Sequence, residues 1–396
     1  MSKVRAKSRL SAAAALLVAG AMMLTACGSS DDGGGSDDGA IVIGMLAPLT
    51  GAAAVTGEQM ADVVKMAVEE INADGGVEGR DLELKVYDDK LTADDAAKAA
   101  QRAITVDKVT ALVGTLASAS ALAVREVAER NKVPFLVPAA SATEVTEGSE
   151  YVYRVTVDIE QLATATIGIA QPLKAQSVAL LYDNGAVGQG YAEIASDQAG
   201  GLGIDVKAIQ YTTGASSMAS VVQEAKRDNP DAVMIAGSAG ADYGLILKSM
   251  VEEGLDVPVM GLTTMIGPDA VSVGGDAYNT LPGLYVALAR DPENPRYQEF
   301  TEQYAEKHDG EAGVNDFAAQ SYDAVHILQQ SLEATSGKGG EALADALNDL
   351  EPYPGVSVPE DATISFADGH DGFAAVTMNV FQYTDGALKP STLVLE

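Results

Sequence analysis

The sequence has a single cysteine, Cys27, among its 396 residues. Because no cysteine follows it, the rest of the chain can form no disulfide, no thiolate zinc site and no cysteine nucleophile. The folded part must therefore be stabilised by its hydrophobic core alone. The roughly 355 residues beyond position 40 are enough for such a core, and a chain of that length is expected to form two domains.

Basic residues are also scarce, with 25 Lys and Arg against 57 Asp and Glu. Four of the basic residues precede Cys27, so cleavage there would leave 21 against 57, a net charge of −36. Such a surface repels phosphate backbones and anionic lipid head groups. The composition thus predicts no nucleic-acid partner and no flat binding to a membrane, with most carboxylates on a solvated surface.

Patterns that would indicate catalysis are missing. The three histidines, His308, His326 and His370, have no partners at metal-ligand spacing. Gly237–Gly240 lacks the spacing of a Gly-x-Ser-x-Gly motif, and the glycines of Gly185–Gly190 fall in the wrong order for a dinucleotide fingerprint. We therefore predict no enzyme activity, no catalytic residue, no metal and no cofactor.

The first 27 residues have the pattern of an export signal. Four basic residues precede a small, apolar run, Ser11–Met23, which is shorter than the about 20 residues that cross a bilayer. Leu24-Thr25-Ala26-Cys27 follows and resembles the lipobox of bacterial lipoproteins, in which the cysteine sulfur carries a diacylglycerol. We expect an exported protein with a lipid anchor on Cys27, on the outer face of the cytoplasmic membrane or in the periplasm. An ordinary signal peptide with an incidental cysteine is the alternative.

A short polar segment separates this signal from the rest of the chain. Gly28–Ala40 contains only Gly, Ser and Asp with one Ala at its end, so it cannot bury apolar surface. We predict a disordered tether, and thirteen such residues have an r.m.s. reach of about 20 Å.

From Ile41 onward, short apolar segments alternate with amphipathic ones. Strands are predicted at 41–46, 82–87, 111–113 and 133–137, and helices at 57–72 and 94–106. After a break near 156–160 the pattern restarts, with strands at 177–182, 204–211, 232–236 and 258–261 and helices that begin near 188, 216, 242 and 267. Two successive βαβα runs predict two α/β domains, each with a parallel sheet.

The last third of the chain departs from this alternation. A strand at 284–288 precedes two long helices, 295–307 and 315–333, and strand-like segments follow at 363–366 and 373–383. We interpret these end segments as a final crossing between the two domains.

Small and polar residues follow several predicted strands. Open α/β sheets bind ligands at this edge, beyond the carboxyl ends of their strands. The residues concerned are Thr50–Gly51, Ser118–Ser120, Ala140–Ser141, Val187–Gly188, Ser238 and Thr263–Thr264. Free N–H groups of a helix N-terminus and a Ser hydroxyl suit a carboxylate, although helix capping alone would also explain Ser118 and Ser120.

An ordered set of short motifs runs through residues 41–396. It comprises Ile43-Gly44, Thr50-Gly51, Ile71–Gly76, Tyr87-Asp88-Asp89, Val113–Ser118, Pro138–Ser141, Val187–Gly190, Met260-Gly261, Ser321–Ala324 and Phe366–Gly369. In this order and spacing, the motifs resemble the periplasmic solute-binding proteins of the leucine/isoleucine/valine-binding type, the receptors of branched-chain amino acid ABC importers.

The resemblance implies a two-lobed type I periplasmic-binding-protein fold of the α/β class. Each lobe would hold a mostly parallel sheet flanked by helices, and three hinge crossings near 156–160, 284–287 and 373–380 would join them. Lobe 1 would comprise 41–157 plus 286–372, and lobe 2 would comprise 158–285 plus 373–396.

The resemblance also implies a ligand site in the cleft between the lobes. Its residues would be Ser118, Ala140, Ser141, Thr56, Val187, Ser238 and Thr263. Ser118, Ala140 and Ser141 match positions that grip a ligand carboxylate. Thr263, Val187 and Ser238 (or Ala239) instead replace a Glu and tyrosines that meet an ammonium in leucine-type receptors. Either another acid, Asp242 or Glu58, meets the cation, or the ligand is not an ordinary α-amino acid.

The implied function is capture of a branched-chain amino acid, or a related small carboxylate or amide, for an ABC permease and its ATPase subunits. The cleft would close on the solute by hinge motion. A receptor of the same fold that signals to a partner is the alternative, because no motif separates the two roles.

Overall fold

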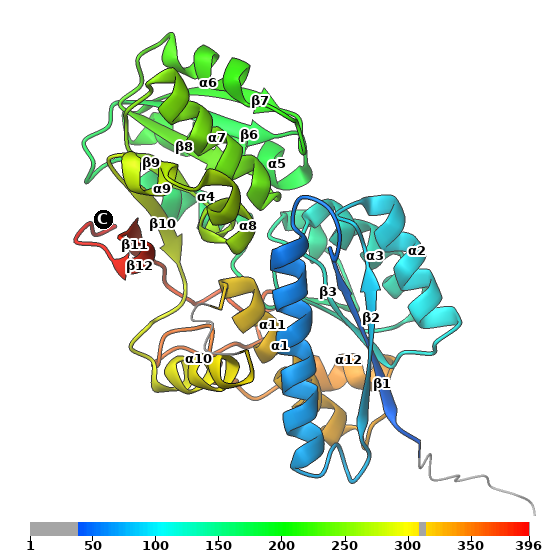
Figure 1. Cartoon of the computed structure of the whole chain (residues 1–396). Helices are drawn as coiled ribbons and strands as arrows, with labels where there is room; N and C mark the ends of the chain where they lie inside the picture. Colours follow the sequence, from blue (N-terminus) through cyan, green and yellow to red (C-terminus); the bar gives the residue numbers. More distant parts are fainter. Residues whose placement is uncertain (1–38, 309–313, 396) are drawn as a thin grey trace, which may run out of the picture. The chain divides into compact units, whose positions relative to one another are not determined.

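The computed structural model describes residues 39–308 and 314–395. The predicted signal peptide, Cys27 and all but the last two residues of the predicted tether lie outside the described residues. Strands and helices alternate along the described chain and build two sheets, of five and seven strands (Figure 1). Within the described ranges, no helix is long and apolar enough to span a bilayer.

The five-stranded sheet is parallel throughout and has the order β2-β1-β3-β4-β5. Its strands are β1 (Ile41–Ala47), β2 (Leu82–Asp88), β3 (Ala111–Gly114), β4 (Phe135–Val137) and β5 (Val152–Arg154). Successive side chains of a strand point to opposite faces. Met45 therefore packs into one hydrophobic cluster while its neighbour Leu46 packs into the other.

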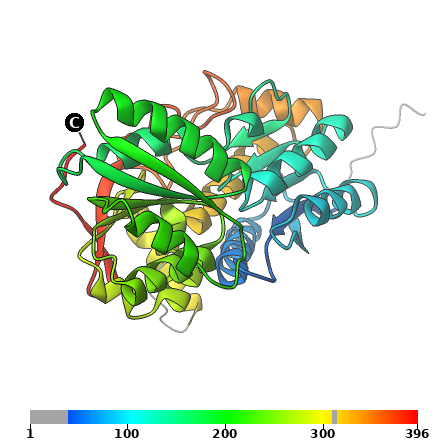
Figure 2. The same ribbon diagram turned by 90° about the horizontal axis from the view of Figure 1, so that it is seen from above.

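Helices from two distant parts of the sequence belong to the same unit as this sheet. They are α1 (Ala54–Ala73), α2 (Ala93–Thr105), α3 (Ser118–Asn131), the short 3-10 helix η1 (Thr143–Val145), α10 (Pro295–Lys307), α11 (Asp316–Ala334) and α12 (Glu341–Asn348). Helix α2 packs on α3, and α11 packs on α1, α12, β3 and β4. Figures 1 and 2 both show the late helix α11 beside the early, blue helix α1. The chain thus returns to its first sheet after completing most of the second.

The seven-stranded sheet has the order β12-β11-β10-β9-β8-β6-β7. Its strands are β6 (Ser177–Asp183), β7 (Asp205–Tyr211), β8 (Ala232–Ala236), β9 (Val259–Gly261), β10 (Leu284–Leu288), β11 (Asn379–Thr384) and β12 (Ala387–Pro390). The first five of these are parallel, and β11 and β12 add an antiparallel edge.

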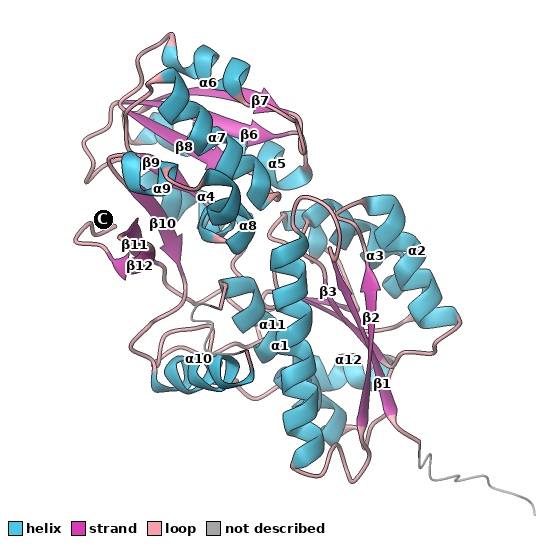
Figure 3. Cartoon of the chain, viewed as in Figure 1, coloured by secondary structure: helices cyan, strands magenta, loops and turns pink. Residues whose placement is uncertain are grey.

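Short helices accompany the second sheet, as Figure 3 shows. They are α4 (Ile159–Gly168), α5 (Ala186–Gly201), α6 (Ala219–Lys226), α7 (Gly240–Glu253), η2 (Thr263–Ile266), α8 (Pro268–Gly274) and α9 (Ala277–Thr280). Helix α4 packs on α5, and α6 packs on α7. Two α/β units with mostly parallel sheets confirm the predicted fold class.

The predicted bounds of the late segments that cross between the two sheets need correction. Strand β10 belongs to the second sheet over its whole length, so the chain leaves that sheet after Leu288 and not within 284–287. Residues 363–366 form no strand. Ile364 alone among them makes a β-bridge, an isolated one to Tyr353. The terminal strand begins at Asn379, and a tight turn at Asp385-Gly386 with positive φ at both residues pairs it with β12.

Candidate functional site

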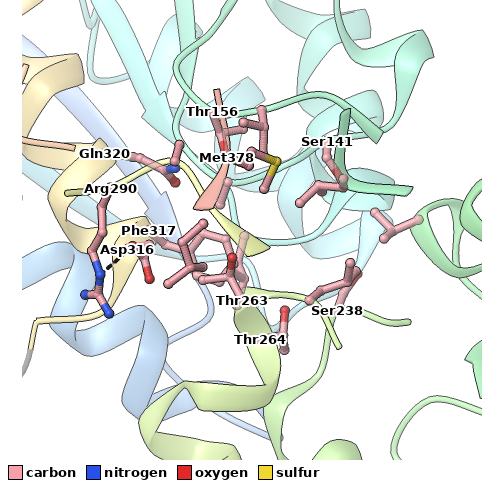
Figure 4. Close-up of a pocket in the computed structure, with 18 of the residues that line it drawn as sticks. Ser141, Thr156, Ser238, Thr263, Thr264, Arg290, Asp316, Phe317, Gln320 and Met378 are labelled. Atoms are coloured by element: carbon pink, nitrogen blue, oxygen red, sulfur yellow. Dashed lines mark ion pairs between the residues drawn. The ribbon is translucent and has the colours of Figure 1, made fainter. Parts of the chain in front are cut away.

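A pocket that is partly open to solvent lies where the carboxyl ends of strands from both sheets meet. Its lining comes from loops after β3, β4, β5, β6, β8 and β9, from the end of β10, from α4 and α11, and from the segment before β11. Figure 4 shows residues from both sheets around one space. This is the edge at which open α/β sheets bind ligands.

Four of the seven predicted ligand residues line this pocket, namely Ser141, Val187, Ser238 and Thr263. Ser118, Ala140 and Thr56 are buried and do not line it. The Oγ of Ser118 accepts the Ala142 N–H at 3.2 Å, which ties the loop after β3 to the loop after β4. Direct contact of any of the seven residues with a ligand stays a prediction.

The backbone at Ser141 is held by a buried arginine. Arg154, fully buried at the end of β5, donates from Nη1 to the Ser141 carbonyl, and that carbonyl also accepts the Ile159 N–H at 2.8 Å. The Arg154 Nε donates to Asp371 Oδ1 at 2.7 Å, and this ion pair balances the positive charge of Arg154. Since a buried charge needs such partners, Arg154 fixes Ser141 and ties it to the segment that returns toward β11.

On the other sheet, Asp183 organises the backbone around Val187 and Ser238. Its carboxylate accepts the Gly185 N–H at 3.0 Å and the Ser238 N–H at 2.9 Å. Burial raises the pKa of Asp183, against the effect of these hydrogen bonds. A Cβ at Gly188 would overlap the Asp183 carboxylate and carbonyl, so the close approach requires glycine. Gly188, within the Gly185–Gly190 segment, therefore serves local packing.

Thr56 contacts the second sheet's helices instead of the pocket. Its N–H and Oγ1 both donate to Asp269 Oδ2, at 2.7 and 2.6 Å, and the Val55 N–H donates to Oδ1 at 3.1 Å. Asp269 lies in the first turn of α8. These bonds connect the N-terminus of α1, beside the first sheet, with a helix that lies between strands β9 and β10 of the second sheet.

Helix α11 forms one end of the pocket, and the polar group at this end was not predicted from the sequence. Arg290 follows β10 directly, and its Nε lies 3.4 Å from Asp316 Oδ1 (Figure 4). Asp316, Phe317 and Gln320 lie in the first two turns of α11 and line the pocket with Arg290 and Met378. The rule that located Ser141 and Ser238, a polar residue just beyond a strand, would also have found Arg290.

Local structure fixes the geometry of this group. The Asn315 side chain caps α11 by accepting the Ala318 N–H at 2.9 Å, which places Asp316 at the first helical position. Arg290 donates from Nη1 to the Tyr297 hydroxyl at 2.6 Å. Burial raises the pKa of Asp316, and the positive charge of Arg290 opposes that rise.

The two acids considered from the sequence as cation partners do not line the pocket. Asp242 is buried and accepts the Gly214 N–H at 2.9 Å, whereas Glu58 is exposed on α1. Asp316 is the only carboxylate among the lining residues. Within the described part of the chain, no cluster of three His, Cys, Asp or Glu residues could hold a metal ion.

Comparisons with known proteins agree with this architecture. The family model "Periplasmic binding protein" matches residues 40–387. The "Leu/Ile/Val-binding protein homolog 3" of Brucella melitensis is 27% identical over 353 residues, 88% of this chain and 92% of that protein. The "Leucine-, isoleucine-, valine-, threonine-, and alanine-binding protein" of Pseudomonas aeruginosa is 27% identical over 78% of this chain and 82% of its own length.

Among solved structures, the leucine-binding protein LivK of Thermotoga maritima superimposes with a TM-score of 0.81 at 26% identity, and covers 89% of this chain and 98% of its own. The predicted type I periplasmic-binding-protein fold is thereby confirmed. The relatives are binding proteins and not enzymes. This chain belongs to the periplasmic binding protein family.

Proposed function

We propose that this protein is the membrane-anchored, extracytoplasmic solute receptor of an ABC importer. The proposed ligand is a branched-chain amino acid or a related small carboxylate or amide. The observation that carries the proposal is one pocket lined by the strand ends of two α/β units and by the segments that join them. The names of the relatives, which specify leucine, isoleucine and valine, support the amino-acid class.

Closure of the two units on the ligand is part of the proposal. Residues 155–158, 289–294 and the segment before Asn379 connect elements of one sheet with elements of the other. A ligand that contacts both sides of the pocket binds the closed arrangement better and so shifts the population toward it. The hydrogen bonds between Asp269 and the start of α1 would add to the closed arrangement in the same way.

A screen of amino acids, small amides and small acids tests the receptor function. At about 100 times its Kd, a true ligand stabilises the folded chain by about 2.7 kcal/mol, which raises the melting temperature by about 4 °C. Calorimetry would then give its stoichiometry, expected to be one per chain. A library in which no compound shifts the melting temperature would contradict the proposal.

The anchor and the import role are tested in cells. Cys27→Ser should abolish incorporation of labelled fatty acid and release the protein from the membrane fraction, because the sulfur carries the proposed lipid. Deletion of the gene should slow uptake of the ligand identified in the screen. Normal uptake in the deletion strain would argue for the signalling role instead.

A further inference from the structure

Two hydrogen-bond acceptors in the pocket have no partner among the described residues. They are Asp316 Oδ2 and Gln320 Oε1. Each residue is only 5% exposed, and both line the pocket. A buried polar atom without a partner is costly, and such atoms in native proteins are generally satisfied by protein, water or ligand. A bound ligand is therefore expected to donate to them.

The two acceptors occupy the same face of one helix. Asp316 and Gln320 are four residues apart on α11, a spacing that places side chains next to each other. The other carboxylate oxygen of Asp316 faces Arg290, whose Nε lies 3.4 Å away. Arg290 therefore offsets the charge of Asp316 and leaves Oδ2 for the ligand. A group that satisfies both acceptors must carry at least two N–H or O–H donors.

The charges of the lining residues narrow the ligand class further. Arg290 is the only cation and Asp316 the only anion among them, so the pocket as a whole is neutral. A ligand with a net charge would lose hydration without compensation, whereas a zwitterion or a neutral amide would not. The opposite side of the pocket carries Thr263 and Val187, which offer no charge to an ammonium group.

We propose that Asp316 and Gln320 form a subsite for an N–H donor group of the ligand, an inference that rests on the proposed receptor function. The group is a protonated amine or a primary amide, on a molecule with no net charge. The carboxylate that accepts it then comes from α11, beside the first sheet, and not from the loops of the second sheet. Phe317 and Met378 supply apolar surface to the same pocket.

Matched pairs of compounds test this subsite on the full-length protein by calorimetry. The pairs are L-leucine with 4-methylpentanoate, L-alanine with propanoate, and benzamide with benzoate. A further pair combines the tightest ligand from the screen with an analogue that differs from it only in the presence or absence of the N–H donor group. The wild type is expected to prefer the N–H member of a binding pair by about 10- to 100-fold, the effect of one hydrogen bond to a charged group.

Two variants separate the subsite from a structural role. Asp316→Asn removes the charge at nearly constant shape, and Gln320→Met removes the Oε1 acceptor while leaving the Arg290–Asp316 pair intact. Each should lower the preference for the N–H member by about tenfold or more. Gln320→Met should have little effect on the acid, whereas Asp316→Asn leaves the charge of Arg290 unbalanced and should strengthen binding of the acid. Glu302→Gln, which removes an exposed charge on α10 outside this pocket, is the control and should leave the preference unchanged.

The possible outcomes distinguish this inference from the receptor proposal. If an acid without N–H donors binds as tightly as its amine or amide counterpart, the subsite is refuted and the receptor function stands. The same holds if Gln320→Met weakens both members of a pair equally. If no library compound binds, both proposals fail.

Discussion

Asp269 supplies helix α1 with a cap that its own sequence lacks. The residue before this helix is Ala53, which has no side-chain acceptor, and its first turn holds no acidic residue. The Asp269 carboxylate instead accepts the N–H groups of Val55 and Thr56, the second and third residues of α1. These are the N–H groups that a normal N-cap side chain satisfies. The cap comes from a residue 213 positions away, so it exists only while α8 lies against α1.

The size of this contribution follows from the number and kind of bonds. Asp269 accepts three hydrogen bonds of 2.6–3.1 Å and is only 7% exposed. A hydrogen bond to a charged group contributes about 1.5–3 kcal/mol, and an N-cap about 1 kcal/mol. Part of this free energy is recovered when the contact opens, because water then forms hydrogen bonds with the separated groups. We expect Asp269→Ala to destabilise the closed arrangement by about 2 kcal/mol, which lowers the equilibrium constant for closing by about 30-fold.

Calorimetry with the ligand found in the library screen measures this effect. Asp269→Ala should weaken binding by up to about 30-fold, and small-angle scattering should show a larger radius of gyration for the ligand-free variant. Asp276→Asn is the control, because Asp276 is exposed in the same region and its side chain caps no helix. Unchanged affinity and unchanged scattering for Asp269→Ala would refute the reasoning.

A double-mutant cycle decides whether Thr56 acts through Asp269 or contacts the ligand. If the Thr56 hydroxyl serves only Asp269, Thr56→Val should have little further effect on affinity once Asp269→Asn is present. The coupling energy between the two positions should then be about 1–2 kcal/mol. If the two substitutions are additive within about 0.5 kcal/mol, Thr56 contributes to binding independently. The ligand role predicted for it from the sequence would then be supported.

Two further predictions concern the second sheet. Burial raises the pKa of Asp242 to about 6, above its value in the unfolded chain, so its contribution to stability is present below pH 4 and is lost as the pH rises through 6. Asp242→Asn should accordingly flatten the change in urea midpoint between pH 4 and pH 7, and an unaltered profile would contradict this assignment. Gly188→Ala should destabilise by about 1–3 kcal/mol because its Cβ would overlap Asp183. Gly200→Ala, in the same helix with open space around it, should stabilise by about 0.5–1 kcal/mol, and equal melting temperatures for the two variants would oppose the packing argument.

The sequence alone determined the fold class and the edge at which the pocket lies. Strand and helix periods are local properties, and ligand sites of parallel sheets follow strand ends, so Ser141, Val187, Ser238 and Thr263 could be placed at the pocket without coordinates. Strand β5 and helix α4 were not predicted. The boundaries of the predicted elements lie within a few residues of the observed ones, except where the chain returns between the sheets. There a single bridge at Ile364 and the paired edge strand β11 depend on long-range contacts.

The tertiary structure decided which side chains share the pocket and which are used elsewhere. Arg290 and Asp316 are 26 positions apart, and only the packing of α11 beside the end of β10 pairs them. The hydroxyl of Thr56 donates to Asp269 because the first turn of α8 lies against the start of α1, a contact that the sequence did not predict. Hydrogen bonding and burial depend on neighbours that are distant in sequence, and no local pattern encodes those neighbours.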